Sequence, residues 1–115
     1  MSVTIYHNPR CSKSRETLAL LESRDVQPEI VEYLKTPIDE ATLSTLLQKL
    51  GFTSAHQLVR SKETIYKELG LSKDCDEARI RQAMLENPKL IERPIVVKGE
   101  QAAIGRPPES VLDIL

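Results

Sequence analysis

The chain has 115 residues, with 16 basic and 17 acidic side chains and a formal net charge of −1. This length suits one compact domain, and the charge balance gives no basic field for nucleic acid. Only four residues are aromatic, too few for a surface on which single-stranded bases stack. No apolar run approaches the roughly 20 residues that span a bilayer, and the amino terminus leads directly into a strand pattern, so we expect neither a membrane span nor a signal peptide.

The first part of the chain predicts a strand, a helix and a second strand. Residues 3–6 are β-branched and aromatic, and residues 29–33 have the alternation typical of a strand. Between them, residues 12–24 contain good helix formers, with Leu18 and Leu21 three positions apart. These segments predict a right-handed β-α-β unit.

A helical region follows. Thr36 resembles an N-cap and Pro37 a first helical residue, and the leucines that follow form an apolar face that ends at Gly51. Three shorter helices are expected at residues 54–59, 63–69 and 76–85. We expect Ser72 or Asp74 to cap the last of them.

The end of the chain predicts a hairpin and a covering helix. Residues 95–98 are an apolar strand, residues 99–100 a turn and residues 102–104 an antiparallel return. A final helix starts at Pro107 or Pro108, with Val111, Leu112 and Leu115 facing inward. The order β-α-β, helical block, β-β-α predicts an α/β, thioredoxin-like fold, with residues 1–115 as one domain and a helical insertion at about residues 37–87.

Cys11 lies where the first strand gives way to the first helix, with His7, Arg10, Lys13 and Arg15 nearby. Free N–H groups and the helix dipole in a first turn favour a thiolate, and basic neighbours lower a thiol pKa from its usual ~8.5. The same features bind anions. The sequence therefore predicts a nucleophile in an anion site rather than an ordinary buried cysteine.

The residue at the fourth position of this motif is Ser14, which makes the motif C-x-x-S and not C-x-x-C. A covalent intermediate on Cys11 therefore needs an outside thiol, from glutathione or a partner protein. Ser14 either donates a hydrogen bond to the thiolate or faces solvent as an ordinary helical serine.

Three arginines have unusual neighbours. Arg60 closes an apolar stretch, Arg93 precedes Pro94 at the start of a strand, and Arg106 lies between a glycine and two prolines. In a thioredoxin-like fold the loop before the third strand lies beside the cysteine loop, and its X-Pro bond is a candidate for the cis form. The guanidinium fork suits a tetrahedral oxyanion, and the alternative for each arginine is a solvated surface charge.

The remaining candidates carry less chemistry. Cys75 is flanked by Asp74 and Asp76, which oppose a thiolate, so we interpret it as incidental, with a resolving thiol as the alternative. His56 has no ligand partner at metal spacing, and we expect no metal and no bound cofactor. Two cysteines fit a reducing cytoplasm, where we expect this protein to act as a monomer.

Three motifs together resemble the glutaredoxin-coupled arsenate reductase (ArsC) family. They are His-Asn-Pro-x-Cys-x-x-Ser-Arg at residues 7–15, Glu-Arg-Pro-Ile-Val-Val at residues 92–97 and Gly-Arg-Pro-Pro-Glu at residues 105–109. The resemblance extends over essentially the whole chain. It implies that Cys11 is the nucleophile, that His7 and Ser14 tune its thiolate, and that an oxyanion site is formed by a set of three arginines: Arg60, Arg93 and Arg106.

The resemblance also implies a reaction. Arsenate binds to the arginines, the Cys11 thiolate attacks arsenic, glutathione resolves the adduct as arsenite leaves, and a glutaredoxin removes the mixed disulfide. Two alternatives stay open: a redox-responsive regulator of the Spx type that binds RNA polymerase, and a glutathione-dependent thiol transferase. The first usually has C-x-x-C at this turn, and the second needs Cys11 but not all three arginines.

Overall fold

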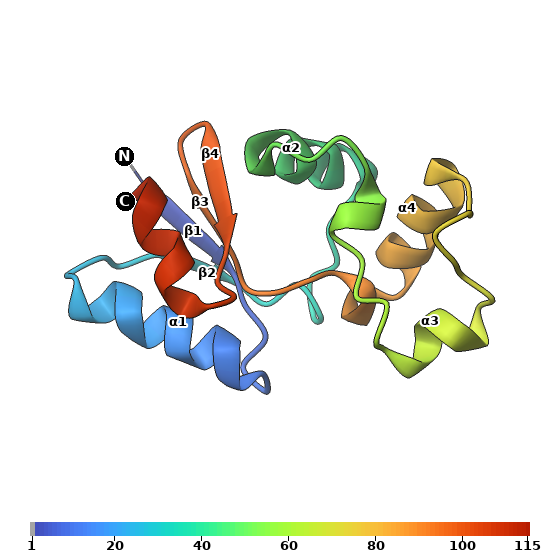
Figure 1. Cartoon of the computed structure of the whole chain (residues 1–115). Coiled ribbons are helices and arrows are strands. Elements are labelled where there is room, and N and C mark those ends of the chain that lie inside the picture. Colours follow the sequence, from blue (N-terminus) through green and yellow to red (C-terminus); the bar gives the residue numbers. More distant parts are fainter. Residues whose placement is uncertain (1) are drawn as a thin grey trace. The chain divides into compact units, whose positions relative to one another are not determined.

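The computed structural model describes residues 2–115 (Figure 1). The chain forms two compact units. One contains the two ends of the chain, up to Thr36 and from Arg93 onward, and the other spans Pro37–Glu92. The expectation of one domain with an insertion at about residues 37–87 stays a prediction. Along residues 2–115, no helix has the length and apolar character needed to cross a bilayer.

The first unit contains a four-stranded mixed sheet. Its strands are β1 (Val3–Tyr6), β2 (Glu29–Val31), β3 (Ile95–Lys98) and β4 (Gln101–Ile104), in the order β2-β1-β3-β4. β1 runs parallel to β2 and antiparallel to β3, and β3 is antiparallel to β4. Three of the four expected strands agree with the structure within one residue.

The apolar positions of the strands explain how this unit packs. Ile5 and Val96 are direct partners across β1 and β3, and both are fully buried. They cluster with Leu21 of α1 (Ser12–Ser23) and Val111 of η3 (Pro108–Ile114). Figure 1 shows α1 and η3 side by side, and the shared cluster indicates that both cover the same face of the sheet. This is the thioredoxin-like α/β fold that the sequence predicted.

Two expectations for this unit need correction. β2 ends at Val31 and not at residue 33, because the chain turns at Glu32, whose carbonyl accepts the Lys35 N–H at 2.9 Å. The final helix forms as a 3₁₀ helix. Its inward face carries Val111 as expected, and Leu115 packs against the same cluster.

The second unit is helical. It contains α2 (Glu40–Leu50), η1 (Ala55–Gln57), α3 (Thr64–Glu68), α4 (Glu77–Glu86) and η2 (Pro88–Leu90). The end of α2 agrees with the prediction, because Gly51 adopts a left-handed φ of 76° that glycine tolerates. Its start does not, since Asp39 and not Thr36 is the N-cap and accepts the Thr42 N–H at 2.8 Å.

The predicted caps of α4 are also wrong. The N-cap is Asp76, and its side chain makes no capping bond. The Ser72 hydroxyl instead accepts the Asp74 N–H at 3.2 Å and closes the turn before the helix. The Ser72 side chain thus bonds to the backbone of the preceding turn and does not cap the helix.

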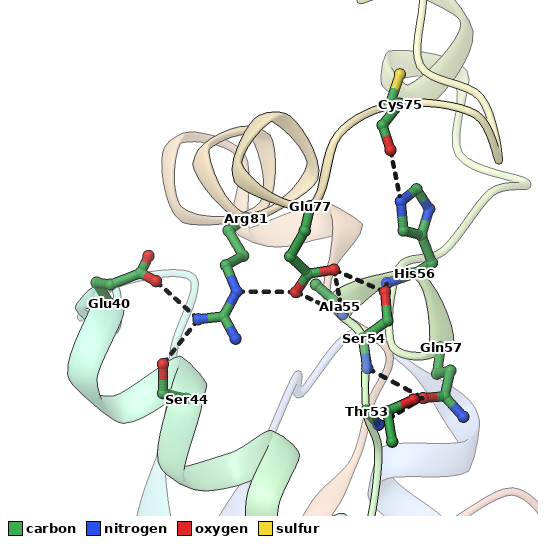
Figure 2. A network of polar contacts seen from close by, with 10 residues as sticks. All are labelled: Glu40, Ser44, Thr53, Ser54, Ala55, His56, Gln57, Cys75, Glu77 and Arg81. Atoms are coloured by element: carbon green, nitrogen blue, oxygen red, sulfur yellow. Dashed lines mark hydrogen bonds and ion pairs between the residues drawn. The ribbon is translucent and has the colours of Figure 1, made fainter.

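A polar network connects three elements of this unit (Figure 2). The Glu77 carboxylate accepts the Ser54 hydroxyl at 2.6 Å, the Ala55 N–H at 2.9 Å and Arg81 Nε at 2.8 Å. Arg81 Nη1 in turn donates to Glu40 at 2.7 Å. These bonds lower the pKa of Glu77, although partial burial alone would raise it. We call the set Ser54, Ala55, Glu77, Arg81 and Glu40 the Glu77 network.

Candidate active site

Cys11 is the N-cap residue of α1, with an extended backbone (φ −93°, ψ 125°). Its own N–H donates to the Asn8 carbonyl at 3.0 Å, which closes a turn after β1. The Cys11 side chain makes no capping hydrogen bond, but the backbone N–H groups of Ser14 and Lys13 at this helix start help to lower the pKa of its thiol. The thiol thus occupies the position where a helix offers unpaired donors, as the sequence indicated.

Two arginines of the same unit, Arg93 and Arg106, act on this sulfur. Arg106 Nη2 lies 3.3 Å from Cys11 Sγ, and its Nε donates to the Arg93 carbonyl at 2.8 Å. The Arg93 side chain also hydrogen-bonds to the sulfur. The Arg93–Pro94 bond is cis, as considered from the sequence, and so is Arg106–Pro107, which the sequence did not predict.

The pKa of Cys11 reflects this balance. Partial burial raises it, but the Ser14 N–H, the Arg93 side chain, the Lys13 N–H and the Arg106 charge outweigh burial, and the net shift is downward. The thiolate is the nucleophilic form. Two cations on a partly exposed thiolate form a site that can attack a bound electrophile and hold an anion.

The basic neighbours within the loop act differently from the expectation. Arg15 Nη1 donates to the Pro9 carbonyl at 2.9 Å, and Lys13 pairs with Glu16 at 3.4 Å. The positive charge at the sulfur therefore comes from residues distant in sequence. His7 is almost fully buried, and burial is the main cause that lowers its pKa, so at neutral pH it adds no charge to the site.

The backbone N–H of Ser14 lowers the pKa of Cys11, whereas the Ser14 hydroxyl bonds elsewhere. The hydroxyl oxygen accepts the Asn8 N–H at 3.0 Å and lies 2.7 Å from His7 Nδ1. In one tautomer of a neutral imidazole, Nδ1 accepts a hydrogen bond from the Ser14 hydroxyl, and in the other it donates one. Ser14 is fully buried, so its hydroxyl does not face solvent. Within residues 2–115 the bonds of this hydroxyl are those to His7 and Asn8, and the thiolate is not among its partners. Ser14 joins the end of β1 to the start of α1.

Arg60 belongs to the second unit. There its Nη1 pairs with Glu92 at 2.9 Å and its Nε with Glu63 at 3.4 Å. Its backbone N–H donates to the Leu90 carbonyl at 2.7 Å. The assignment of Arg60 to an oxyanion site stays a prediction.

Cys75 also lies in the second unit and is a free thiol. Its sulfur accepts the Ser72 N–H at 3.3 Å, and His56 Nε2 lies 2.9 Å from its carbonyl oxygen. His56 therefore has a structural contact that its sequence position did not suggest. No metal-binding group of three His, Cys, Asp or Glu side chains occurs within residues 2–115.

Two residues next to the site were missed from the sequence. Thr17 is a fully buried polar residue on α1, and Gly105 is a buried glycine beside Arg106. A signal existed for each: a threonine on the apolar face of a helix, and a glycine between a strand and a motif arginine. Neither signal shows what the residue touches.

A low-pKa thiol at a helix start beside two arginines, in a thioredoxin-like fold, defines a thiol-based anion site. The chain belongs to the ArsC family, whose model matches residues 6–114. An arsenate reductase from Haemophilus influenzae is 51% identical over 116 residues, which cover 100% of both chains. A solved structure of an arsenate reductase from Vibrio cholerae has a TM-score of 0.96 and 52% identity, and the match covers 100% of this chain and 98% of that one. A protein from Escherichia coli K12 described as "Uncharacterized protein YfgD" is 60% identical over 98% of this chain and 96% of its own length.

Proposed function

We propose that this protein is an arsenate reductase that uses Cys11 as its nucleophile and glutathione with a glutaredoxin as reductants. One observation carries the proposal: Arg106 Nη2 lies 3.3 Å from the Cys11 sulfur, and both Arg93 and Arg106 lower the pKa of its thiol. The names of two relatives support arsenate as the substrate. Because arsenate is a tetrahedral oxyanion, guanidinium forks at the sulfur bring its arsenic atom to the nucleophile.

The first step forms a sulfur–arsenic bond. The Cys11 thiolate attacks arsenic(V), and one arsenic–oxygen bond breaks as hydroxide leaves and takes a proton to become water. Arg93 and Arg106 hold the remaining oxygens and stabilise their charge. The Ser14 and Lys13 N–H groups lower the pKa of the thiol and so favour the thiolate before the attack.

The second step reduces arsenic. A glutathione thiolate attacks the Cys11 sulfur, and the electron pair of the sulfur–arsenic bond passes to arsenic, which leaves as arsenite. Two thiol sulfurs have lost two electrons, and a Cys11–glutathione disulfide remains. A glutaredoxin thiolate then attacks the glutathione sulfur and frees Cys11. The C-x-x-S motif supports this order, because Ser14 cannot form a disulfide with Cys11. The cycle needs a reducing compartment such as the cytoplasm.

The test is arsenate-dependent NADPH oxidation with glutathione, a glutaredoxin and glutathione reductase. We expect turnover by the wild type, none by Cys11→Ser, and near-normal turnover by the matched control Cys75→Ser. Omitting the glutaredoxin should stop multiple turnovers and leave Cys11 as a glutathione disulfide, detectable by mass.

Three results would redirect the assignment. No arsenate turnover by the wild type contradicts the reductase. Loss of activity in Cys75→Ser contradicts resolution by outside thiols alone. Rapid cleavage of a glutathione mixed disulfide without arsenate, unaffected by Arg106→Ala, indicates a thiol transferase instead.

A further inference from the structure

Gly105 lies where there is no room for a side chain. A Cβ atom on it would overlap Thr17 Oγ1, lie 2.8 Å from Pro94 Cγ and lie 3.0 Å from Thr17 Cγ2. Gly51, Gly70 and Gly99 are the glycines whose φ is positive, and Gly105 is not among them. Glycine is therefore required at residue 105 by space and not by backbone conformation.

The neighbours of Gly105 come from both sides of the active site. Thr17 is fully buried on α1, the helix that starts at Cys11, and its hydroxyl donates to the Lys13 carbonyl at 2.8 Å. Its Oγ1 also lies 3.5 Å from the Gly105 carbonyl oxygen. On the other side, the Gly105 N–H donates to the Pro94 carbonyl at 2.9 Å.

The residues that follow these contacts are the two that bind the sulfur. Arg106 is next to Gly105, and Arg93 is next to Pro94. Arg106 Nε donates to the Arg93 carbonyl at 2.8 Å, and its Nη2 lies 3.3 Å from Cys11 Sγ. Gly105 lies between α1, which starts at Cys11, and Pro94, which follows Arg93. A displacement of residue 105 from α1 therefore moves the neighbouring Arg106 relative to the Cys11 sulfur.

We propose that the contact of Gly105 with Thr17 and Pro94 is a positioning device that sets the distance between the Arg106 guanidinium and the Cys11 sulfur. Thr17 and Gly105 are positioning residues that touch neither sulfur nor substrate. Their part in turnover rests on the proposed arsenate reductase function. Their part in holding the thiolate does not, because it concerns only residues of this chain.

The test is the pH dependence of Cys11 alkylation by iodoacetamide, in a Cys75→Ser background that leaves one thiol. For Gly105→Ala we expect the midpoint to move up toward the free-thiol value of ~8.5, because Arg106 moves away from the sulfur. If the wild type reduces arsenate, kcat/KM should fall about 100-fold in Gly105→Ala, the cost of a misplacement of about 1 Å.

A paired substitution separates positioning from general damage. Thr17→Ala removes Oγ1 and Cγ2, two of the three atoms that a Cβ at residue 105 would meet. The double variant Gly105→Ala/Thr17→Ala should therefore recover part of the midpoint shift. Gly51→Ala is the matched control, since its cost comes from a left-handed φ with no atom within 4 Å, and it should lower stability without moving the midpoint.

The outcomes are distinct. An unchanged midpoint in folded Gly105→Ala, or a double variant no closer to wild type than the single one, overturns the proposal. If Gly105→Ala does not fold, Thr17→Ala decides: a raised midpoint supports the device and an unchanged one contradicts it. A wild type without arsenate turnover but with these midpoint shifts contradicts the proposed function and leaves the positioning intact.

Discussion

The two units each contain a polar cluster, and the clusters use their charges differently. In the Glu77 network the Arg81 guanidinium donates to the Glu77 carboxylate, which also accepts hydrogen bonds from the Ser54 hydroxyl and the Ala55 N–H (Figure 2). At Cys11, backbone N–H groups and two guanidinium groups converge on one ionisable sulfur. Opposite charges that satisfy each other stabilise a fold, whereas donors around a single thiolate prepare a nucleophile.

The difference extends to the arginines themselves. Arg60 and Arg81 each pair with two carboxylates, while Arg106 contacts a sulfur and a backbone carbonyl. Carboxylates compensate the charges of Arg60 and Arg81, whereas the charge of Arg106 also acts on an ionisable thiol and lowers its pKa.

Arg106→Ala should lower arsenate kcat/KM by about 10²–10³, the usual cost of removing one donor that stabilises developing charge. It should also raise the midpoint of Cys11 alkylation, because one cation leaves the sulfur. The coupled NADPH assay and the alkylation profile measure the two effects. Arg106→Lys is the control, since it keeps the charge and loses the fork. Full turnover by Arg106→Ala would contradict the assignment of Arg106 to the oxyanion site.

Ser14→Ala should destabilise the first unit by about 1–3 kcal/mol, because it leaves the buried Asn8 N–H without its acceptor and removes the His7 contact. The alkylation midpoint should barely move, since the Ser14 backbone N–H remains on the sulfur. Denaturant unfolding and the alkylation profile check the two parts. A midpoint shift as large as that of Arg106→Ala would mean that the hydroxyl stabilises the thiolate directly.

Because the family resemblance assigns Arg60 to the oxyanion site, Arg60→Ala should lower arsenate kcat/KM by about 10-fold, the cost of one hydrogen bond to a charged group. The Cys11 alkylation midpoint is measured in the same variant: an unchanged midpoint limits Arg60 to anion binding, and a raised one adds its charge to those that favour the thiolate. Unfolding is measured in parallel, since Glu92 loses an ion-pair partner. Unchanged turnover in a folded variant would show that Arg60 serves its ion pairs only.

Glu77→Gln should lower the free energy of unfolding by about 1 kcal/mol, after a discount for the exposure of the side chain, and leave the thiol unchanged. The pKa of Glu77 is lowered in the folded chain, so its contribution is present above the unfolded value of ~4.3 and is lost as pH falls through the folded value. Urea unfolding from pH 7 down to pH 3 should therefore bring wild type and variant together. A constant gap would contradict an ionised Glu77.

Local sequence patterns predicted most of the elements but not their N-caps. β1 and β3 follow from β-branched and apolar composition, and α1 from helix formers with spaced leucines. The start of α2 was misplaced because Thr36 and Asp39 both offer a capping oxygen, and the structure uses Asp39. Asp and Thr are both favoured N-caps, so the spacing of apolar residues does not show which of the two begins the helix.

Within the site, the sequence alone placed Cys11 at the start of a helix, where the Ser14 and Lys13 N–H groups help to lower the pKa of its thiol. The same reasoning assigned the nearby charge to loop neighbours, which instead bond to Pro9 and Glu16. Arg106 stands 95 residues from Cys11, and only the sheet order and the contact of Gly105 with α1 bring it to 3.3 Å. The sequence determined that the Cys11 thiol lies at a helix start because that geometry is local, whereas tertiary structure decided its partners because close packing joins residues that the chain keeps far apart.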